Sequence, residues 1–416
     1  MARFLFTTWE GGGHVQPLLL AAREAMLEGH EVLVVSDLCN EPDAGFVEVP
    51  FRPWTRAPSQ TGKSREDDRL KDHEADNPLD IIHRLLDRVM TGPALAYALD
   101  ALEVIDTFKP DVVISQELLF GAMVAAEARN LPLAVFAANI WSLPTLEGVP
   151  PFGAGMQPAS SDEERTMHSM VTQMSRGFFQ AGLPALNAAR EALELAPLVD
   201  LFEQVGYAAR VLLATSQAFD FAPDVLPEPF AYAGPYMSDP AWAPRLSAPD
   251  GDAPLVLVSF SSLYQAQEGV LGRVIEALGR LPVRAVVTTG PTLSPDEFKA
   301  PQNVTIVRAG AHSDLLPMAA LFITHAGHGS TLRPLMAGVP LLCLPLGRDQ
   351  HDNAARATGR GAGLVRSAQA SVDELVVAIT TLLDDPVFRE QAVSLGRLVQ
   401  ADFANRRATR LIETLL

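Results

Sequence analysis

The sequence predicts an α/β protein built from two Rossmann-like domains that face each other across a cleft. First, a chain of 416 residues is too long for one compact core and suits two domains of roughly 200 residues each. Second, apolar runs of strand length alternate with amphipathic helical stretches, which is typical of parallel sheets with helices on both faces. Third, this pattern restarts at Pro254, after a stretch rich in Pro, Asp and Ser that is typical of a linker.

The first half contains five short apolar runs that we predict to be strands. In chain order these strands are 3–8, 31–36, 111–116, 133–138 and 211–216, with helices over 14–28 and 120–130. Residues 52–77 are polar and charged and show no apolar period, so we expect a mobile loop or lid there.

The second half repeats the arrangement. Strands are expected at 254–261, 283–290, 303–309, 321–325 and 340–346, with helices over 267–280, 313–319 and 331–338. The predicted organisation is a first domain at 1–235, a linker at 236–253, a second domain at 254–397 and a C-terminal helix at 398–416 that packs back toward the first domain. Paired domains of this kind bind ligands in the cleft, beyond the carboxyl ends of the strands.

Charge and composition exclude several classes of protein. The formal net charge of -18 argues against sequence-independent nucleic-acid binding, which needs Lys and Arg to neutralise phosphates. No apolar run reaches the ~18 residues of a membrane-spanning helix, and glycine breaks the N-terminal apolar stretch too early for a signal peptide. We therefore expect a cytoplasmic monomer or homodimer without membrane insertion. Cys39 and Cys343 are expected in the core, and not in a zinc site or a disulfide.

A glycine-rich turn follows the strand at 321–325, in the segment "THAGHGST". Its glycines allow close backbone approach, and Ser330 and Thr331 open the next helix as caps or first-turn donors. Free amides at the positive end of a helix suit an anion, most naturally a diphosphate, to which His325 adds a donor. The alternative is a capped turn without a ligand.

A second polar cluster, "DQHDN", follows the strand at 340–346. Taken alone, Asp349, Gln350 and Asn353 are typical of a solvated helix start. However, the carboxyl ends of parallel strands share one edge of a sheet. This position beside the anion turn favours a binding site.

The segment "WEGGGH" turns the chain after the first strand and sets His14 at the start of a helix. A histidine can take up a proton near neutral pH, and a helix N-terminus disfavours its charged form. His14 is therefore a candidate general base. The alternative is a histidine that caps the helix or packs in the core.

Several motifs together resemble one family. "HAGHGST", "AGVP" and "GRDQHDNAAR" resemble the C-terminal donor signature of GT-B glycosyltransferases of the macrolide and natural-product type, the UDP-glycosyltransferase-like family 1. "GGGHVQPLLLAARE" is similar to the turn and first helix of that family. The resemblance implies an inverting hexosyltransferase that moves a sugar from a UDP- or dTDP-sugar to a hydroxyl of a hydrophobic acceptor such as a polyketide, macrolide or flavonoid. The first domain then binds the acceptor and the second the nucleotide sugar.

The resemblance also implies roles for three groups of residues. The catalytic group is His14 as base, supported by Gln116 or Glu117. The donor-binding group is Ser261, Ser262, Gly290, His312, His325, Gly327, Gly329, Ser330, Thr331, Asp349 and Gln350. The acceptor-binding group is Gly13, Trp9, Trp54, Phe120 and Trp141. No metal and no cofactor are expected, because the nucleotide sugar is a substrate.

Two positions depart from the family pattern. The family orients its catalytic histidine with an aspartate after the strand at 111–116, where this sequence has Gln116 and Glu117. Arg333 stands where many members have a glutamate that accepts hydrogen bonds from the ribose, and an arginine cannot accept them. This change favours a dTDP donor, whose deoxyribose lacks the 2'-hydroxyl.

Three other functions share features with this architecture. A UDP-sugar epimerase of the same architecture shares the diphosphate site and uses no acceptor. A catalytically inactive homologue that acts as a partner protein is favoured by Gln116 and Arg333. A dinucleotide dehydrogenase is disfavoured because "GGGH" lacks the last glycine of the G-x-G-x-x-G pattern. Asp250 and Asp252 have the spacing of a metal-binding pair but lie in the linker, away from any strand end.

Overall fold

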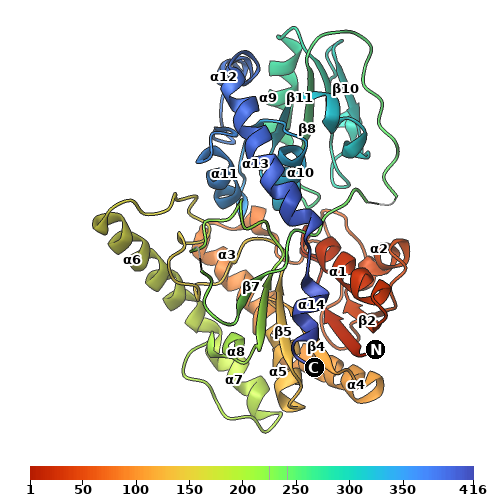
Figure 1. Ribbon diagram of the computed structural model, residues 1–416, viewed down its shortest axis with the longest axis vertical. Coiled ribbons are helices and arrows are strands. Elements are labelled where there is room, and N and C mark those ends of the chain that lie inside the picture. Colours follow the sequence, from red (N-terminus) through yellow and green to blue (C-terminus); the bar gives the residue numbers. More distant parts are fainter. Residues whose placement is uncertain (224, 241) are drawn as a thin grey trace.

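Seven parallel strands form the first sheet of the computed structural model, which describes residues 1–223, 225–240 and 242–416 (Figure 1). Their order across the sheet is β3-β2-β1-β4-β5-β6-β7. Successive side chains of a strand face opposite sides, so Phe4 and Phe6 enter one core and Leu5 the other. The strands are β1 Arg3–Thr7, β2 Glu31–Ser36, β3 Phe51–Pro53, β4 Val112–Gln116, β5 Leu133–Ala137, β6 Arg210–Leu213 and β7 Phe230–Tyr232.

Helices cover both faces of this sheet. α1, α2 and the C-terminal α14 pack on one face, and α4, α5, α7 and α8 pack on the other. The helices that precede the second sheet are α1 Val15–Leu27, α2 Glu41–Phe46, α3 Pro78–Leu85, α4 Ala94–Phe108, α5 Phe120–Ala128, α6 Asp162–Phe179, α7 Leu183–Glu191 and α8 Glu203–Gly206.

Six parallel strands form the second sheet, in the order β10-β9-β8-β11-β12-β13. α9 and α12 pack on one face, and α10, α11 and α13 on the other. We call the units around the two sheets the first and second domain. The elements of the second are β8 Leu255–Ser259, α9 Glu268–Gly279, β9 Arg284–Thr288, β10 Val304–Val307, β11 Ala319–Thr324, α10 His328–Met336, β12 Leu341–Cys343, α11 Gln350–Thr358, β13 Gly363–Val365, α12 Val372–Asp384 and α13 Pro386–Ala404.

The chain returns to the first domain at its end. The long helix α13 runs from the second domain toward the first, and α14 (Ala408–Glu413) packs against α1 and β6 (Figure 1). Ala408 and Ile412 of α14 are fully buried in the first domain's core. Both chain termini therefore lie in the first domain.

The predicted α/β class with two parallel sheets is confirmed, and every predicted strand is present with ends that differ by a few residues. The sequence did not indicate β3, β7 and β13, each only three residues long. The helix expected over 313–319 was wrong in type, because the chain there forms two 3-10 turns. α10 begins at His328, ahead of the predicted 331.

Two irregular segments connect these elements. The predicted lid begins within β3 and continues as a loop with one 3-10 turn at Asp72–Glu74. We call residues 54–77 the bridging loop, because its side chains contact both domains. The described residues of the predicted linker 236–253 contain no helix or strand, and Ala241 lies outside the described residues. In the described part of the chain, no helix combines the length and the apolar character needed to cross a bilayer.

Candidate functional site

The turn after β1 brings His14 to the boundary between the domains. Gly12 has φ +80°, and a side chain there would lie 2.9 Å from Leu263 of the second domain. Gly11 leaves room for the histidine ring, because a Cβ on Gly11 would lie 2.8 Å from His14 Nδ1. His14 itself is the N-cap residue of α1. The glycines thus set both the turn and the place of the histidine.

His14 is neutral in this environment. Burial, and to a lesser extent the positive charge of Arg348, lowers the pKa of His14 to about 4. Its Nδ1 is buried and has no hydrogen-bond partner among the described residues. The ring lies edge-on to Trp9, with centroids 6.0 Å apart. An uncharged imidazole at this place is able to accept a proton.

The two residues expected to support His14 have other partners. Gln116 Oε1 accepts hydrogen bonds from Trp9 Nε1 (3.2 Å) and Leu118 N (2.8 Å). Glu117 Oε1 accepts one from Ser142 Oγ (2.6 Å), and burial raises the pKa of Glu117 to about 8. Support of His14 by Gln116 or Glu117 therefore stays a prediction for the substrate complex.

The turn before α10 has the geometry of an anion site. Gly327 is the N-cap residue, and the first helical hydrogen bond runs from Thr331 N to its carbonyl (2.9 Å). The hydroxyls of Ser330 and Thr331 also donate to that carbonyl (3.0 Å each), so these residues stabilise the turn and do not cap the helix. Backbone amides of a first helical turn, including that of Gly329, have no acceptor within the helix. They are available to an anion.

His325 lies beside this turn, directly after β11. The residue is 8% exposed, and burial lowers the pKa of His325 to about 4. A Cβ on Gly327 would lie 2.6 Å from His325 Nε2, so glycine is needed there for the ring to keep its place. A neutral imidazole offers one N–H to a phosphate.

Three of the other expected donor residues lie on turns of the same sheet edge. Ser261, after β8, is buried and accepts a hydrogen bond from Leu263 N (3.1 Å) through its hydroxyl. Ser262 is exposed. Gly290, after β9, has φ +79° and approaches the Ser261 carbonyl so closely that a Cβ would lie 3.1 Å from it.

Arg333 is held by the segment that joins the domains. It forms an ion pair with Asp239 and donates to the carbonyl of Ser238 (3.3 Å). His312 lies against the same guanidinium and is bonded to Thr288 Oγ1 (3.1 Å). Burial, with a smaller effect of Arg333, lowers the pKa of His312 to about 4. Arg333 is therefore largely enclosed by protein. It can pair with a ligand only if its ion pair with Asp239 breaks.

Asp349 and Gln350, in the polar cluster at the start of α11, have different roles. Asp349 Oδ2 accepts hydrogen bonds from Asn353 Nδ2 (2.8 Å) and, across the domain boundary, from Asn139 Nδ2 (3.4 Å). Gln350 Oε1 accepts from two backbone amides of the preceding turn (2.7 and 3.2 Å), and its Nε2 donates to Gln265 (2.8 Å). Asp349 faces the first domain, whereas Gln350 braces the turn.

Buried polar atoms without partners gather around these three turns. Within the described residues they include His14 Nδ1, Gln116 Nε2, Glu117 Oε2, Asn139 Oδ1, His325 Nδ1, Arg348 Nη2 and Asn353 Oδ1. Buried polar groups are normally hydrogen-bonded. Unused donors and acceptors from both domains therefore mark the place where a polar ligand would complete the site.

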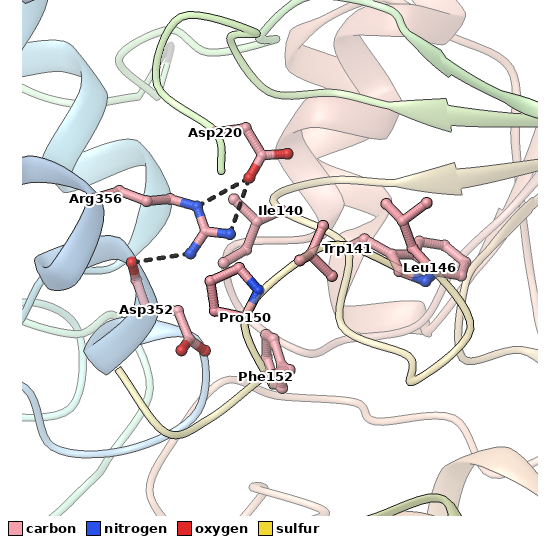
Figure 2. A pocket seen from close by; sticks show the side chains of 9 residues that line it. Ile140, Trp141, Leu146, Pro150, Phe152, Asp220, Asp352 and Arg356 are labelled. Atoms are coloured by element: carbon pink, nitrogen blue, oxygen red, sulfur yellow. Dashed lines mark hydrogen bonds and ion pairs between the residues drawn. The ribbon is translucent and has the colours of Figure 1, made fainter. Parts of the chain in front are cut away.

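An apolar wall adjoins this polar region in residues 139–157, which we call the docking loop (Figure 2). A cavity of about 10 Å³ lies between the loop and α11. Its walls are Ile140, Trp141, Leu146, Val149, Pro150 and Phe152 on the loop side, facing Asp220, Asp352 and Arg356. This volume holds about one water molecule. A small-molecule acceptor therefore fits here only after the docking loop moves.

Polar contacts hold the docking loop against α11. Asp352 accepts hydrogen bonds from the amides of Gly153 (2.6 Å) and Gly155 (2.9 Å). Beside it, Arg356 donates through Nε to Asp220 Oδ1 (2.9 Å) (Figure 2). Burial raises the pKa of Asp352 to about 6.

The expected acceptor residues differ in their accessibility. Trp9, Trp54 and Phe120 are 1%, 3% and 0% exposed, within the core of the first domain. Their indole and phenyl rings have no surface left for a ligand in this conformation, because the sheet and its helices cover them. Trp141 lines the cavity, and Gly13 is exposed on the first turn.

Sequence reasoning missed four residues that the structure brings to the site. Arg348 contributes a charge near His14 and His325, Asn139 and Asp352 join the domains, and Asp72 of the bridging loop pairs with Arg348. Arg348 precedes "DQ" directly, so its position was a usable signal. Nothing local in the sequence indicates that Asn139 and Asp72 reach the second domain, or that Asp352 reaches the first.

One group among the described residues has the geometry to hold a cation. Ligand atoms of Asp68, Asp72 and His73 lie within 4.8 Å of one another. Arg348 already pairs with Asp72, and both oxygens of Asp68 accept backbone amides (3.2 Å each). These contacts make the group part of the bridging loop's own structure.

Comparison with known proteins adds a family to this geometry. Residues 164–403 match the UDP-glucoronosyl and UDP-glucosyl transferase family. The 4'-demethylrebeccamycin synthase of Lentzea aerocolonigenes is 28% identical over 100% of both chains. The oleandomycin glycosyltransferase of Streptomyces antibioticus is 32% identical over 45% of this chain and 44% of its own.

Solved structures agree with the fold. The glycosyltransferase of kitacinnamycin superimposes with a TM-score of 0.78 at 22% identity, over 100% of this chain and 99% of that one. A Streptomyces sp. SF2575 glycosyltransferase complexed with thymidine diphosphate has a TM-score of 0.64 at 18% identity, over 100% of each chain. The GT-B architecture expected from the motifs is thereby confirmed.

Proposed function

Because the chain belongs to the UDP-glucoronosyl and UDP-glucosyl transferase family and is a nucleotide-sugar-dependent glycosyltransferase, we propose how its residues perform the transfer. The proposed reaction moves a hexosyl group with inversion from a UDP- or dTDP-sugar to a hydroxyl of an apolar acceptor. The observation that carries it is the neutral His14 of the first domain, which is close enough to His328 at the start of α10 to act on its protonation.

The donor's diphosphate is proposed to lie at the N-terminus of α10. Amides near Gly329 supply donors there, and His325 supplies one more. A sugar attached to that diphosphate would extend toward Asp349 and Asn139, which already meet across the domain boundary at 3.4 Å. Asp349 is the acceptor of hydrogen bonds from the sugar hydroxyls in this arrangement.

The transfer itself is a single displacement. The acceptor oxygen attacks the anomeric carbon, the bond from that carbon to the diphosphate oxygen breaks, and the electron pair leaves on the diphosphate. His14 takes the proton of the attacking hydroxyl. The donors around α10 stabilise the charge that grows on the leaving group. Attack from the face opposite the diphosphate inverts the anomeric configuration.

The acceptor is proposed to be an apolar small molecule such as a polyketide, macrolide or flavonoid. The support is the apolar wall of the docking loop, above all Trp141 and Phe152, in a loop whose first residue, Asn139, is bonded to Asp349 (3.4 Å). The two natural-product transferases named above are consistent with this class of acceptor. They also favour transfer over the epimerase and partner-protein alternatives.

No metal enters the proposed mechanism, because the N-terminus of α10 and a nearby arginine supply the positive field that the diphosphate requires, and neutral His325 adds an N–H donor. Turnover should accordingly survive dialysis against EDTA.

The decisive experiment combines binding and product analysis. Wild-type protein is screened with UDP, dTDP and their sugars by thermal shift, since a ligand of the folded state raises the melting temperature. The stabilising donors are then incubated with flavonoid and macrolide alcohols. A glycoside of inverted configuration is expected. Hydrolysis or epimerisation of the sugar nucleotide without a glycoside, or a retained configuration, would overturn the proposal.

A further inference from the structure

Arg348 occupies an unusual place between β12 and α11. Its backbone has φ 56°, in the left-handed region that residues other than glycine rarely adopt. Such conformations persist only where the surrounding structure holds them, and they cluster at functional sites. The residues that follow Arg348 in the sequence are Asp349 and Gln350, both expected at the donor site.

The guanidinium group of Arg348 is only partly used. Its Nε donates to Asp72 Oδ2 of the bridging loop at 2.5 Å. Its Nη2 is buried and has no partner among the residues that the structure describes. The side chain is 21% exposed, so most of it is enclosed by protein.

The positive charge of Arg348 is close enough to both histidines of the proposed reaction to disfavour their protonated forms. It acts electrostatically on His14 of the first domain and on His325 of the second. In the proposed function the bond that breaks lies between the base and the diphosphate turn. A cation near both histidines is therefore able to stabilise the negative charge that grows on the leaving diphosphate.

We propose that Arg348 binds the β-phosphate of the nucleotide-sugar donor, and that Asp72 holds its guanidinium until the nucleotide displaces the carboxylate. This inference rests on the proposed function and assigns one further residue to it. An arginine presents a planar fork of N–H donors that matches a phosphate, whose oxygens only accept. The charge on the β-phosphate oxygen grows as the bond to the sugar breaks, so the contact strengthens toward the transition state.

The bridging loop supplies Asp72, the carboxylate that the nucleotide would displace from Arg348. Besides the pair with Arg348, it reaches the second domain through Arg65, 3.8 Å from both the Glu268 carboxylate and the centre of the Tyr264 ring. On the first domain it is anchored by a buried ion pair between Arg69 and Asp37. Asp72 thus sits on a loop tied to both domains, and its release from Arg348 couples donor binding to that loop.

The first test separates the β-phosphate from the rest of the nucleotide. Calorimetric titration of UDP, UMP, dTDP and dTMP is compared for wild type and Arg348→Met. The diphosphates should lose about 10- to 100-fold in affinity, the range of a hydrogen bond to a charged group, while the monophosphates change little. Arg348→Lys, which keeps the charge and loses the fork, should fall between the two. Arg397→Met, an exposed arginine on α13, is the control.

The second test addresses the exchange. Asp72→Asn removes the competitor, so diphosphate affinity should rise several-fold, whereas the exposed Asp76→Asn on the same loop should have no effect. In the double variant Arg348→Met/Asp72→Asn this gain should vanish, and that variant also leaves no unpaired carboxylate.

An equal loss for mono- and diphosphates in Arg348→Met, or lower diphosphate affinity in Asp72→Asn, would overturn the inference. Absence of any nucleotide binding to the wild type would instead reject the proposed function.

Discussion

Burial keeps the histidines of the site neutral. The pKa of each of His14, His312, His325 and His328 is lowered to about 4, mainly because burial removes water from the charged form. Arg348 keeps its charge. Neutral histidines close to Arg348, Arg333 and Arg356 favour an anionic ligand over a cationic one, in agreement with a nucleotide donor.

His14→Ala tests the base. Proton removal by a positioned base contributes about 100- to 10,000-fold, so turnover of an aliphatic alcohol should fall on that scale. A phenolic acceptor should lose less, because it needs less help to ionise. Steady-state rates on both acceptors and titration with UDP or dTDP are the measurements. Unchanged turnover of the aliphatic alcohol, or loss of donor binding, would contradict the assignment.

The pH profile of kcat at saturating substrates tests the charge state of His14. A general base is active when unprotonated, and a lowered pKa means that it binds its proton only at lower pH. Activity should therefore stay level between about pH 7 and pH 5 and fall as the pH approaches about 4. A decline centred near 6.5, the ordinary value for histidine, would show that burial does not control this group. Circular dichroism at each pH controls for unfolding.

Asp349 and Gln350 should separate in their effects. Asp349→Ala removes the proposed ligand of the sugar hydroxyls, so turnover should fall while UDP or dTDP still binds. Gln350→Ala removes the acceptor of two backbone amides in the turn before α11. Both turnover and nucleotide affinity should therefore fall in this variant. Titration and turnover of both variants check this. Equal loss of nucleotide affinity in the two would mean that Asp349 serves the fold or the nucleotide.

At the scale of elements, strand ends and first helical turns carry the chemistry. β11, β12 and β8 are neighbours in the second sheet, so the turns that follow them meet at one edge. In the first sheet β1, β4 and β5 are neighbours in the same way, which brings together His14, Glu117 and Asn139. The side chains themselves add specificity to a geometry that the parallel sheets create.

Gly327→Ala tests the turn before α10. The new methyl group would approach His325 Nε2 to 2.6 Å, so the ring must move and donor affinity should fall about 10-fold, as for His325→Ala. Gly272→Ala on α9 is the matched control, because a Cβ there meets nothing within 4 Å. Affinity is measured with UDP and dTDP. Normal binding by Gly327→Ala would mean that His325 does not contact the donor.

Much of the fold and of this site could be predicted from the sequence, and the limits have physical causes. Strands such as β1 and β11 are buried on both faces and appear as continuous apolar runs. β3 and β13 are too short to show any period. The turns at His14 and His325 were predicted because glycine and helix starts leave local signals. The partners Asp72 and Asn139 were not, because contacts between distant segments follow from packing and leave no local pattern.

At the scale of the whole molecule, polar contacts hold the two domains together. Thr215 meets His328 (2.8 Å), Asn139 meets Asp349 (3.4 Å), and Asp72 pairs with Arg348. Hydrogen bonds of this kind exchange readily with water and with substrates. Apolar contacts add to them, because Ile140 and Phe219 of the first domain are buried in the core cluster around β11 and α10.

Asp352→Asn tests one of these contacts. An amide oxygen can replace only one of the two carboxylate oxygens that accept from Gly153 and Gly155, so the docking loop loses part of its hold on α11. We expect KM for the acceptor to change about 10-fold, with donor affinity preserved. Asp384→Asn, exposed on α12, is the control. An unchanged acceptor KM would remove the docking loop from the acceptor site.

The return of α14 to the first domain has a consequence for the order in which the protein matures on the ribosome. The first domain's core includes Ala408 and Ile412, which follow the whole second domain in the chain and are therefore synthesised after it. The second domain has all its strands and helices by then, because it lies inside the chain between two parts of its neighbour. The first domain emerges earlier yet completes later, and until the final helix arrives a face of α1 and β6 stays open to chaperones.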